Sequence, residues 1–164
     1  MAAIDILCND FSPEGIRKNY AENEEEKSRF AQVGRAHNFV GYETPEFLRR
    51  MDALGVEKLL VCAIKTWSYK HQRPLESSSV EEVAALAAQA PGRIFGLYGV
   101  NVHRGMAGVA EFARSVREHG FKGLHIHRHG YGLPPDHAPY FPSSAPAPAL
   151  PVPAVISMGH TLDL

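Results

Sequence analysis

The prediction of the fold starts from the stretch Gly-Phe-Lys-Gly-Leu-His-Ile-His-Arg-His, at residues 120–129. A glycine turn leads into a short apolar strand, which opens into a polar loop. Because alternate residues of a strand face the same side, His125 and His127 should share one face. Leu124 and Ile126 should share the other, which suits a hydrophobic core. The histidine face then suits catalysis or ligand binding at the strand's carboxyl end; the alternative is a strand end that merely meets solvent.

The composition is that of a globular protein with no excess of either charge. The chain has 164 residues, of which 45% are hydrophobic and 21% are charged, with a formal net charge of -1. This length predicts one domain, 1–164, with a core of its own. The charge balance gives no reason to expect nucleic acid or a membrane surface as a partner. Cys8 and Cys62 lie in apolar runs, which is typical of buried, reduced thiols. No stretch of the sequence resembles a signal peptide or a membrane span. We therefore expect a cytoplasmic protein.

Apolar runs and amphipathic stretches alternate along the chain. The predicted strands are 3–8, 59–64, 94–102, 122–127 and 155–160. The predicted helices are 22–32, 44–54, 80–90 and 105–119, with Thr44 and Ser79 as N-caps. The first run fits a buried strand, and the residues between 64 and 79 are expected to form a loop. Strands that alternate with helices predict parallel β/α units with right-handed crossovers.

Two stretches break this alternation. Residues 11–43 form a long, polar insertion, which is either a solvated surface or a lid over a site. Residues 142–154 are rich in proline and alanine, and their five prolines exclude a helix. We expect an irregular, polyproline-like segment there. A shifted reading frame and a natural proline-rich loop are the two explanations that fit this composition.

Four motifs give the sequence a family resemblance. They are RIFG at 93–96, NVHRG at 101–105, GFKGLHIH at 120–127 and PDHAPYFP at 135–142. Together they resemble the amidohydrolase-related branch of the amidohydrolase superfamily, which includes aminocarboxymuconate-semialdehyde and dihydroxybenzoate decarboxylases. The resemblance covers about residues 4–160 and implies a (β/α)₈ barrel with its site at the carboxyl ends of the strands. Such a barrel needs on the order of 250 residues. The expectation is therefore an α/β protein with a partial TIM barrel of about five strands, representing the N-terminal half.

The resemblance implies a hydrolase or carboxy-lyase that acts on a small carboxylate or carbonyl substrate, with a divalent, zinc-like metal as cofactor. The family's first strand carries two metal-binding histidines, and Leu7 and Asn9 stand at those positions here. Leucine binds no metal and asparagine is a weak zinc ligand, so we expect the standard metal site to be largely lost. On the fifth strand Ser157 replaces another family histidine.

The candidate site residues lie where the predicted strands end. The candidates for proton transfer are His127, His160 and His103. The candidates for substrate contact are Asn9, His125, Lys65 and Trp67. Two alternatives stay open. The histidines at 125, 127, 129 and 137 could bind zinc or nickel without function. The chain could also be a non-catalytic relative or fragment that acts as a self-associating binding module, giving a homo-oligomer, because open strand edges promote pairing.

Overall fold

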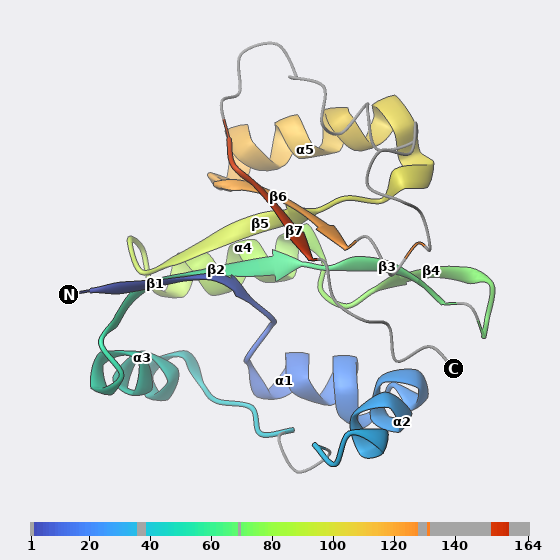
Figure 1. The fold of residues 1–164 in the computed structure, drawn as a ribbon. Coiled ribbons are helices and arrows are strands. Elements are labelled where there is room, and N and C mark those ends of the chain that lie inside the picture. Colours follow the sequence, from blue (N-terminus) through green and yellow to red (C-terminus); the bar gives the residue numbers. More distant parts are fainter. Residues whose placement is uncertain (1, 36–38, 69, 128–130, 132–151, 158–164) are drawn as a thin grey trace.

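The computed structural model describes residues 2–35, 39–68, 70–127, 131 and 152–157, and a parallel sheet organises them (Figure 1). Its strand order is β1-β2-β5-β6-β7. These strands are β1 (Ala3–Cys8), β2 (Val56–Ala63), β5 (Ile94–Gly99), β6 (Gly123–His127) and β7 (Ala154–Ser157). The α/β class and the partial TIM barrel are thereby confirmed.

A separate two-stranded hairpin follows the end of β2 (Figure 1). It consists of β3 (Lys65–Ser68) and β4 (Arg73–Glu76), which pair antiparallel. The prediction of a loop between 64 and 79 was wrong here, because cross-strand pairing formed where the polar sequence gave no clear alternation. The predicted strand at 94–102 is also shorter, since β5 ends at Gly99 and a 3₁₀ turn, η3 (Val102–Arg104), follows.

The helices connect the strands as the β/α alternation predicts. They are α1 (Pro13–Ile16), the π-helical η1 (Arg17–Ala21), α2 (Glu24–Gln32), α3 (Thr44–Ala53), α4 (Val80–Gln89) and α5 (Gly105–His119). Ser79 caps α4 as predicted, and Glu82 completes a capping box. The N-cap of α3 is Glu43 and not Thr44. Thr44 is buried and donates its hydroxyl to Gln89 Oε1 at 2.6 Å, so it joins α3 to α4 instead.

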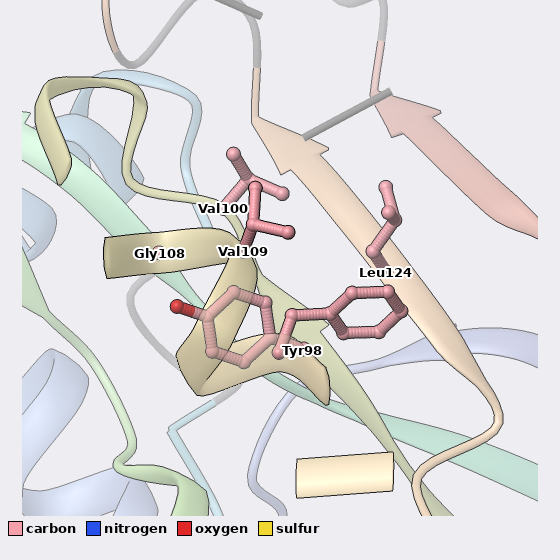
Figure 2. Close-up of a pocket in the computed structure, with 6 residues that line it drawn as sticks. Tyr98, Val100, Gly108, Val109 and Leu124 are labelled. Carbon is pink, nitrogen blue, oxygen red and sulfur yellow. The ribbon is translucent and has the colours of Figure 1, made fainter. Parts of the chain in front are cut away.

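The core lies between the outer face of the sheet and the helices. Alternate residues of β2 and β5 are buried together with α4, among them Val61, Val83 and Ile94. Tyr98 and Leu124 are partners in the β5–β6 register, and both border a small apolar cavity of about 10 Å³ against α5 (Figure 2). Leu124 therefore faces the helix layer.

Strand β1 differs from the buried strand that its sequence predicts. It is an edge strand, paired only with β2 among the described strands, and Ile4 and Ile6 are 55% and 60% exposed. An apolar run in a parallel sheet is covered only where a neighbour or a helix lies against it. No such element lies over these two side chains in the described part of the chain.

The insertion at 11–43 is anchored to the sheet although its surface is charged. Tyr20, Phe30 and Phe39 form an aromatic cluster with ring centroids 5.3 to 5.4 Å apart. Asn19 donates to Ser78 Oγ, and Ser78 donates to the buried Asp10, both at 3.2 Å. These contacts tie α1 and η1 to the segment that leads into α4. The charged residues of the insertion do not predict these apolar contacts and hydrogen bonds.

Replacing Ser79 with alanine should lower the free energy of unfolding by about 1 kcal/mol, because the cap satisfies a backbone N–H at the start of α4. Urea unfolding followed by far-UV circular dichroism measures this loss. Ser28→Ala is the control, since Ser28 is exposed within α2 and alanine is the better helix former. An equal loss in both variants would contradict the role of the cap.

Candidate functional site

The carboxyl ends of the parallel strands meet along one edge of the sheet, where ligand sites of such folds are found. Each strand of the parallel sheet except β7 carries or precedes a candidate at this edge. The candidates are Asn9 after β1, Lys65 and Trp67 after β2, His103 after β5, and His125 and His127 in β6. His160 lies outside the described residues, as do the histidines at 129 and 137.

His125 and His127 lie together on the inner face of the sheet. Their ring centroids are 5.8 Å apart, and His125 is only 1% exposed. The Nε2 atom of His125 is 2.7 Å from Ser157 Oγ on β7, a hydrogen bond whose direction depends on the imidazole tautomer. The register pairs His127 with Ser157 and His125 with Val155, which places the serine beside both rings. The residue that replaces a family histidine is thus the hydrogen-bond partner of His125.

A second group joins the hairpin, the turn η3 and Tyr131 at the same edge. The ring of His103 meets Trp67 edge-on, with centroids 5.2 Å apart and planes at 64°. On its other side it meets Tyr131, with centroids 5.6 Å apart and planes at 67°. We call Trp67, His103 and Tyr131 the aromatic row. The structure therefore brings Trp67 and His103 together, and it adds Tyr131, a buried residue that the sequence did not single out.

Lys65 lies on the helix side of the sheet, which differs from the predicted contact with substrate. It is 3% exposed, and its Nζ atom is 3.0 Å from Glu111 Oε1 on α5. The same ammonium lies 4.6 Å from the ring centroid of Tyr98, whose hydroxyl donates to Glu111 Oε2 at 2.9 Å. A charge withdrawn from water needs such partners, so Lys65 is committed to this cluster.

The pKa of Glu111 is lowered overall. Burial, the largest influence, raises the pKa, but the hydrogen bonds from Lys65 and Tyr98 and the charges of Lys65 and Arg104 outweigh it. Glu111 is therefore a carboxylate at neutral pH. The sequence did not single it out, because one glutamate on an amphipathic helix looks like a solvated residue.

The first strand offers little to a ligand in this structure. Asn9 is exposed and donates its Nδ2 atom to Tyr20 Oη at 2.5 Å, so the amide is held by the insertion. Burial, assisted by Asp5 and Asp10, raises the pKa of Cys8 to about 12, so this thiol stays protonated at neutral pH. Burial also raises the pKa of Cys62. Neither cysteine is therefore a free thiolate nucleophile at neutral pH.

The donors at this edge do not fit a divalent metal of the family's type. Leu7 has no donor atom, Asn9 offers only a neutral amide, which is a weak ligand, and His125 Nε2 is bonded to Ser157. Within residues 2–35, 39–68, 70–127, 131 and 152–157, no three His, Cys, Asp or Glu side chains are grouped to hold a metal ion. The loss of the two strand-one ligands stays a prediction from the sequence.

A polar groove of about 410 Å³ separates the insertion from the hairpin. Its walls come from η1, the start of α2 and the β3–β4 hairpin, with charged groups such as Lys18, Glu24 and Arg73 facing it. Ser68 on the hairpin donates to Glu25 Oε1 on α2 at 2.6 Å, so the two walls are connected. The groove has both charges along its walls and does not select an anion or a cation.

Comparisons with known proteins point to one family. Residues 46–162 match the family model described as amidohydrolase. A structure of 5-carboxyvanillate decarboxylase from Novosphingobium aromaticivorans, with manganese and a nitrobenzoic acid, aligns with a TM-score of 0.57 and 19% identity. The alignment covers 86% of this chain and 46% of that one. A mutant of that decarboxylase, also with manganese, gives 0.58 and 21% over the same shares. This chain thus spans about half the length of these enzymes.

Other comparisons add less. A 2,6-dihydroxybenzoate decarboxylase aligns with a TM-score of 0.45 and 19% identity over 77% of this chain and 39% of that one, which is too weak to support an argument. No curated protein sequence matches significantly. No described helix has the length and apolar character needed to cross a membrane. The likeness to the solved structures, at these identities, concerns the fold.

The stabilising effect of Glu111 should depend on pH. Because its pKa in the folded state is lowered from the ordinary 4.5, its contribution is complete above that value and is lost as the pH falls through the lowered pKa. We therefore expect Glu111→Gln to reduce the free energy of unfolding by about 2 kcal/mol at neutral pH, since Lys65 loses its partner, and by less in acid.

Urea unfolding over a series of pH values measures this difference. The control is Glu57→Gln, which removes an exposed carboxylate paired with Lys58 and should change stability little at any pH. A gap between the wild type and Glu111→Gln that stays constant into strong acid would contradict the linkage.

Proposed function

This chain belongs to the amidohydrolase family, and we propose that it provides part of the site of a hydrolase or carboxy-lyase for a small carboxylate or carbonyl substrate. The observation that carries the proposal is the pair His125 and His127 on the inner face of β6, at the carboxyl edge of a parallel sheet. Imidazoles titrate near neutral pH and are suited to moving a proton to or from a bound substrate.

We assign separate roles to the histidines. His125 is buried and held by Ser157, which suits it to orienting substrate by a hydrogen bond. His127 is only half-buried, which suits it to proton transfer. His103 is exposed in the aromatic row and is the second candidate for that role. His160 remains a proposed third candidate.

The proposed substrate contacts follow from the chemistry of the remaining groups. Trp67 offers an apolar ring beside His103, and Asn9, whose Nδ2 atom is bonded to Tyr20, offers its amide oxygen at the end of β1. Lys65 acts through its ion pair in this proposal and does not touch substrate. The insertion at 11–43 is the proposed lid, and its hydrogen bond from Ser68 to Glu25 links it to the hairpin that carries Trp67. A cytoplasmic location stays a prediction from composition.

A decarboxylation requires a proton donor in the site. In a decarboxylation the bond to the carboxyl carbon breaks, carbon dioxide leaves, and the remaining carbanion takes a proton from an acid. A protonated His127 could supply that proton. The structures that share this fold are named as decarboxylases of aromatic carboxylates. Hydroxybenzoic acids are therefore the first substrates to test.

Replacing His127 with glutamine should lower turnover by about 10²-fold or more, because the amide cannot transfer a proton. The measurement is loss of a hydroxybenzoic acid from a panel, followed by chromatography, with amide and lactone substrates run beside it to detect hydrolysis. Each assay is run with manganese, with zinc and with chelator.

His119→Gln is the matched control, since His119 is an exposed histidine at the end of α5, remote in the fold from the carboxyl edge. It should keep the wild-type rate. Equal turnover in the His127 and His119 variants would remove His127 from the site, and no turnover of any panel member by the wild type would leave the second function below.

The second candidate function is a self-associating binding module. The observation that favours it is the exposure of Ile4 and Ile6 on the edge strand β1, together with 45% exposure of Ile156 on the other edge strand, β7. Unpaired strand edges with apolar side chains promote association between chains. A homo-oligomer built through these edges is the form that this candidate takes.

Changing both Ile4 and Ile6 to lysine should convert an oligomer into a monomer, because two charges would be buried at the strand edge. Light scattering after size-exclusion chromatography measures the mass. Leu54→Lys is the control, since Leu54 is 79% exposed at the end of α3 and belongs to neither edge. A wild-type chain that runs as a clean monomer would argue against this function.

A further inference from the structure

Glu111 stands where three elements of the carboxyl edge meet. Its Oε1 atom accepts from Lys65, the first residue of β3, at 3.0 Å. Its Oε2 atom accepts from Tyr98 on β5 at 2.9 Å and lies 3.7 Å from Arg104 Nε at the end of η3. One carboxylate on α5 therefore contacts the hairpin, the sheet and the turn after β5.

Two of these contacts lie next to members of the aromatic row. Lys65 and Trp67 are two residues apart in β3, so their side chains share a face of that strand. Arg104 directly follows His103 in η3. A carboxylate that fixes Lys65 and attracts Arg104 thereby limits how far Trp67 and His103 can separate.

Glu111 interacts more strongly with Lys65 than with Arg104. Lys65 is 4% exposed in its side chain, so its charge cannot leave Glu111 without moving β3 or losing its compensation. Arg104 is 53% exposed and its contact is long, so it contributes a weaker attraction. The turn has a second support, because the buried Asn101 accepts from the backbone N–H of His103 at 3.0 Å.

We propose that Glu111 is a positioning residue, which holds the hairpin against η3 and so fixes the edge-on contact between Trp67 and His103. The consequence for catalysis rests on the proposed function of His103, but the positioning itself does not. A carboxylate with buried partners on β3 and β5 holds the hairpin against the strand that leads into η3, whereas a single aromatic contact leaves each segment free to move.

The sequence makes the test direct, because Trp67 is the only tryptophan in the chain. Its emission in the absence of substrate reports on its own surroundings. In Glu111→Gln we expect emission at longer wavelength and a rise of roughly twofold in the acrylamide quenching constant, since a half-buried ring becomes exposed when its segment opens. His103→Ala provides the reference for a Trp67 ring without its partner.

A double variant separates positioning from simple neutralisation of a buried charge. Removing both partners of a buried ion pair is close to neutral for stability. Lys65→Met with Glu111→Gln should therefore regain the wild-type unfolding temperature while the Trp67 signals stay shifted, because methionine forms no directed link to α5. The double variant also keeps the test valid if Glu111→Gln alone does not fold.

The control is Asp52→Asn, which breaks the ion pair of Asp52 with Arg93 (2.6 Å), where α3 leads into β2. It should leave the Trp67 emission unchanged. Unchanged emission in Glu111→Gln, or recovery of the Trp67 signals along with stability in the double variant, would overturn the proposal. Failure to find any substrate would leave these readouts intact, so the proposed function and the positioning role are tested separately.

Discussion

Parallel pairing is the constraint on which the rest of this structure depends. Because β1, β2, β5, β6 and β7 run in the same direction, the described connections between them return along the outside of the sheet, and α4 and α5 occupy two of these return paths. The same pairing places the polar residues that follow the strands along one edge. A candidate site therefore forms from segments far apart in sequence without any long-range polar motif.

The two faces of β6 show how the sheet divides structure from chemistry. Leu124 points into the layer between sheet and α5, beside Tyr98, while His125 points to the inner face and bonds to Ser157. A change of register by one residue would exchange these faces. Because the apolar face of β6 is buried against the helix layer, the histidines are directed to the opposite, inner face.

The edge strands of the sheet carry apolar side chains that the described residues do not cover. On β1 an apolar run is exposed, and the chain spans about half the length of the decarboxylases that share its fold. The residues present also disagree with the family's metal. The family implies a divalent metal, whereas the strand-one positions hold a leucine and an asparagine. Catalysis at the carboxyl edge and self-association through the edge strands are therefore separate hypotheses about the same chain.

Local patterns in the sequence determined most of the elements. The period of apolar residues predicted the strands and helices, and Ser79 predicted the cap of α4, because these signals act over a few residues. Alternation also predicted that His125 and His127 share a face. The motif resemblance predicted the partial barrel, which the fold confirms.

Only the tertiary structure decided which partner each polar group has. Thr44 bonds to Gln89, Asn9 to Tyr20, and Lys65 to Glu111, and each pair joins residues separated by at least 11 positions. Such contacts depend on how elements pack, and a glutamate on an amphipathic helix carries no local mark of a buried partner. The sequence by itself therefore determined the elements and their order, whereas the packing of those elements decided the burial of Lys65 and the meeting of Trp67 with His103.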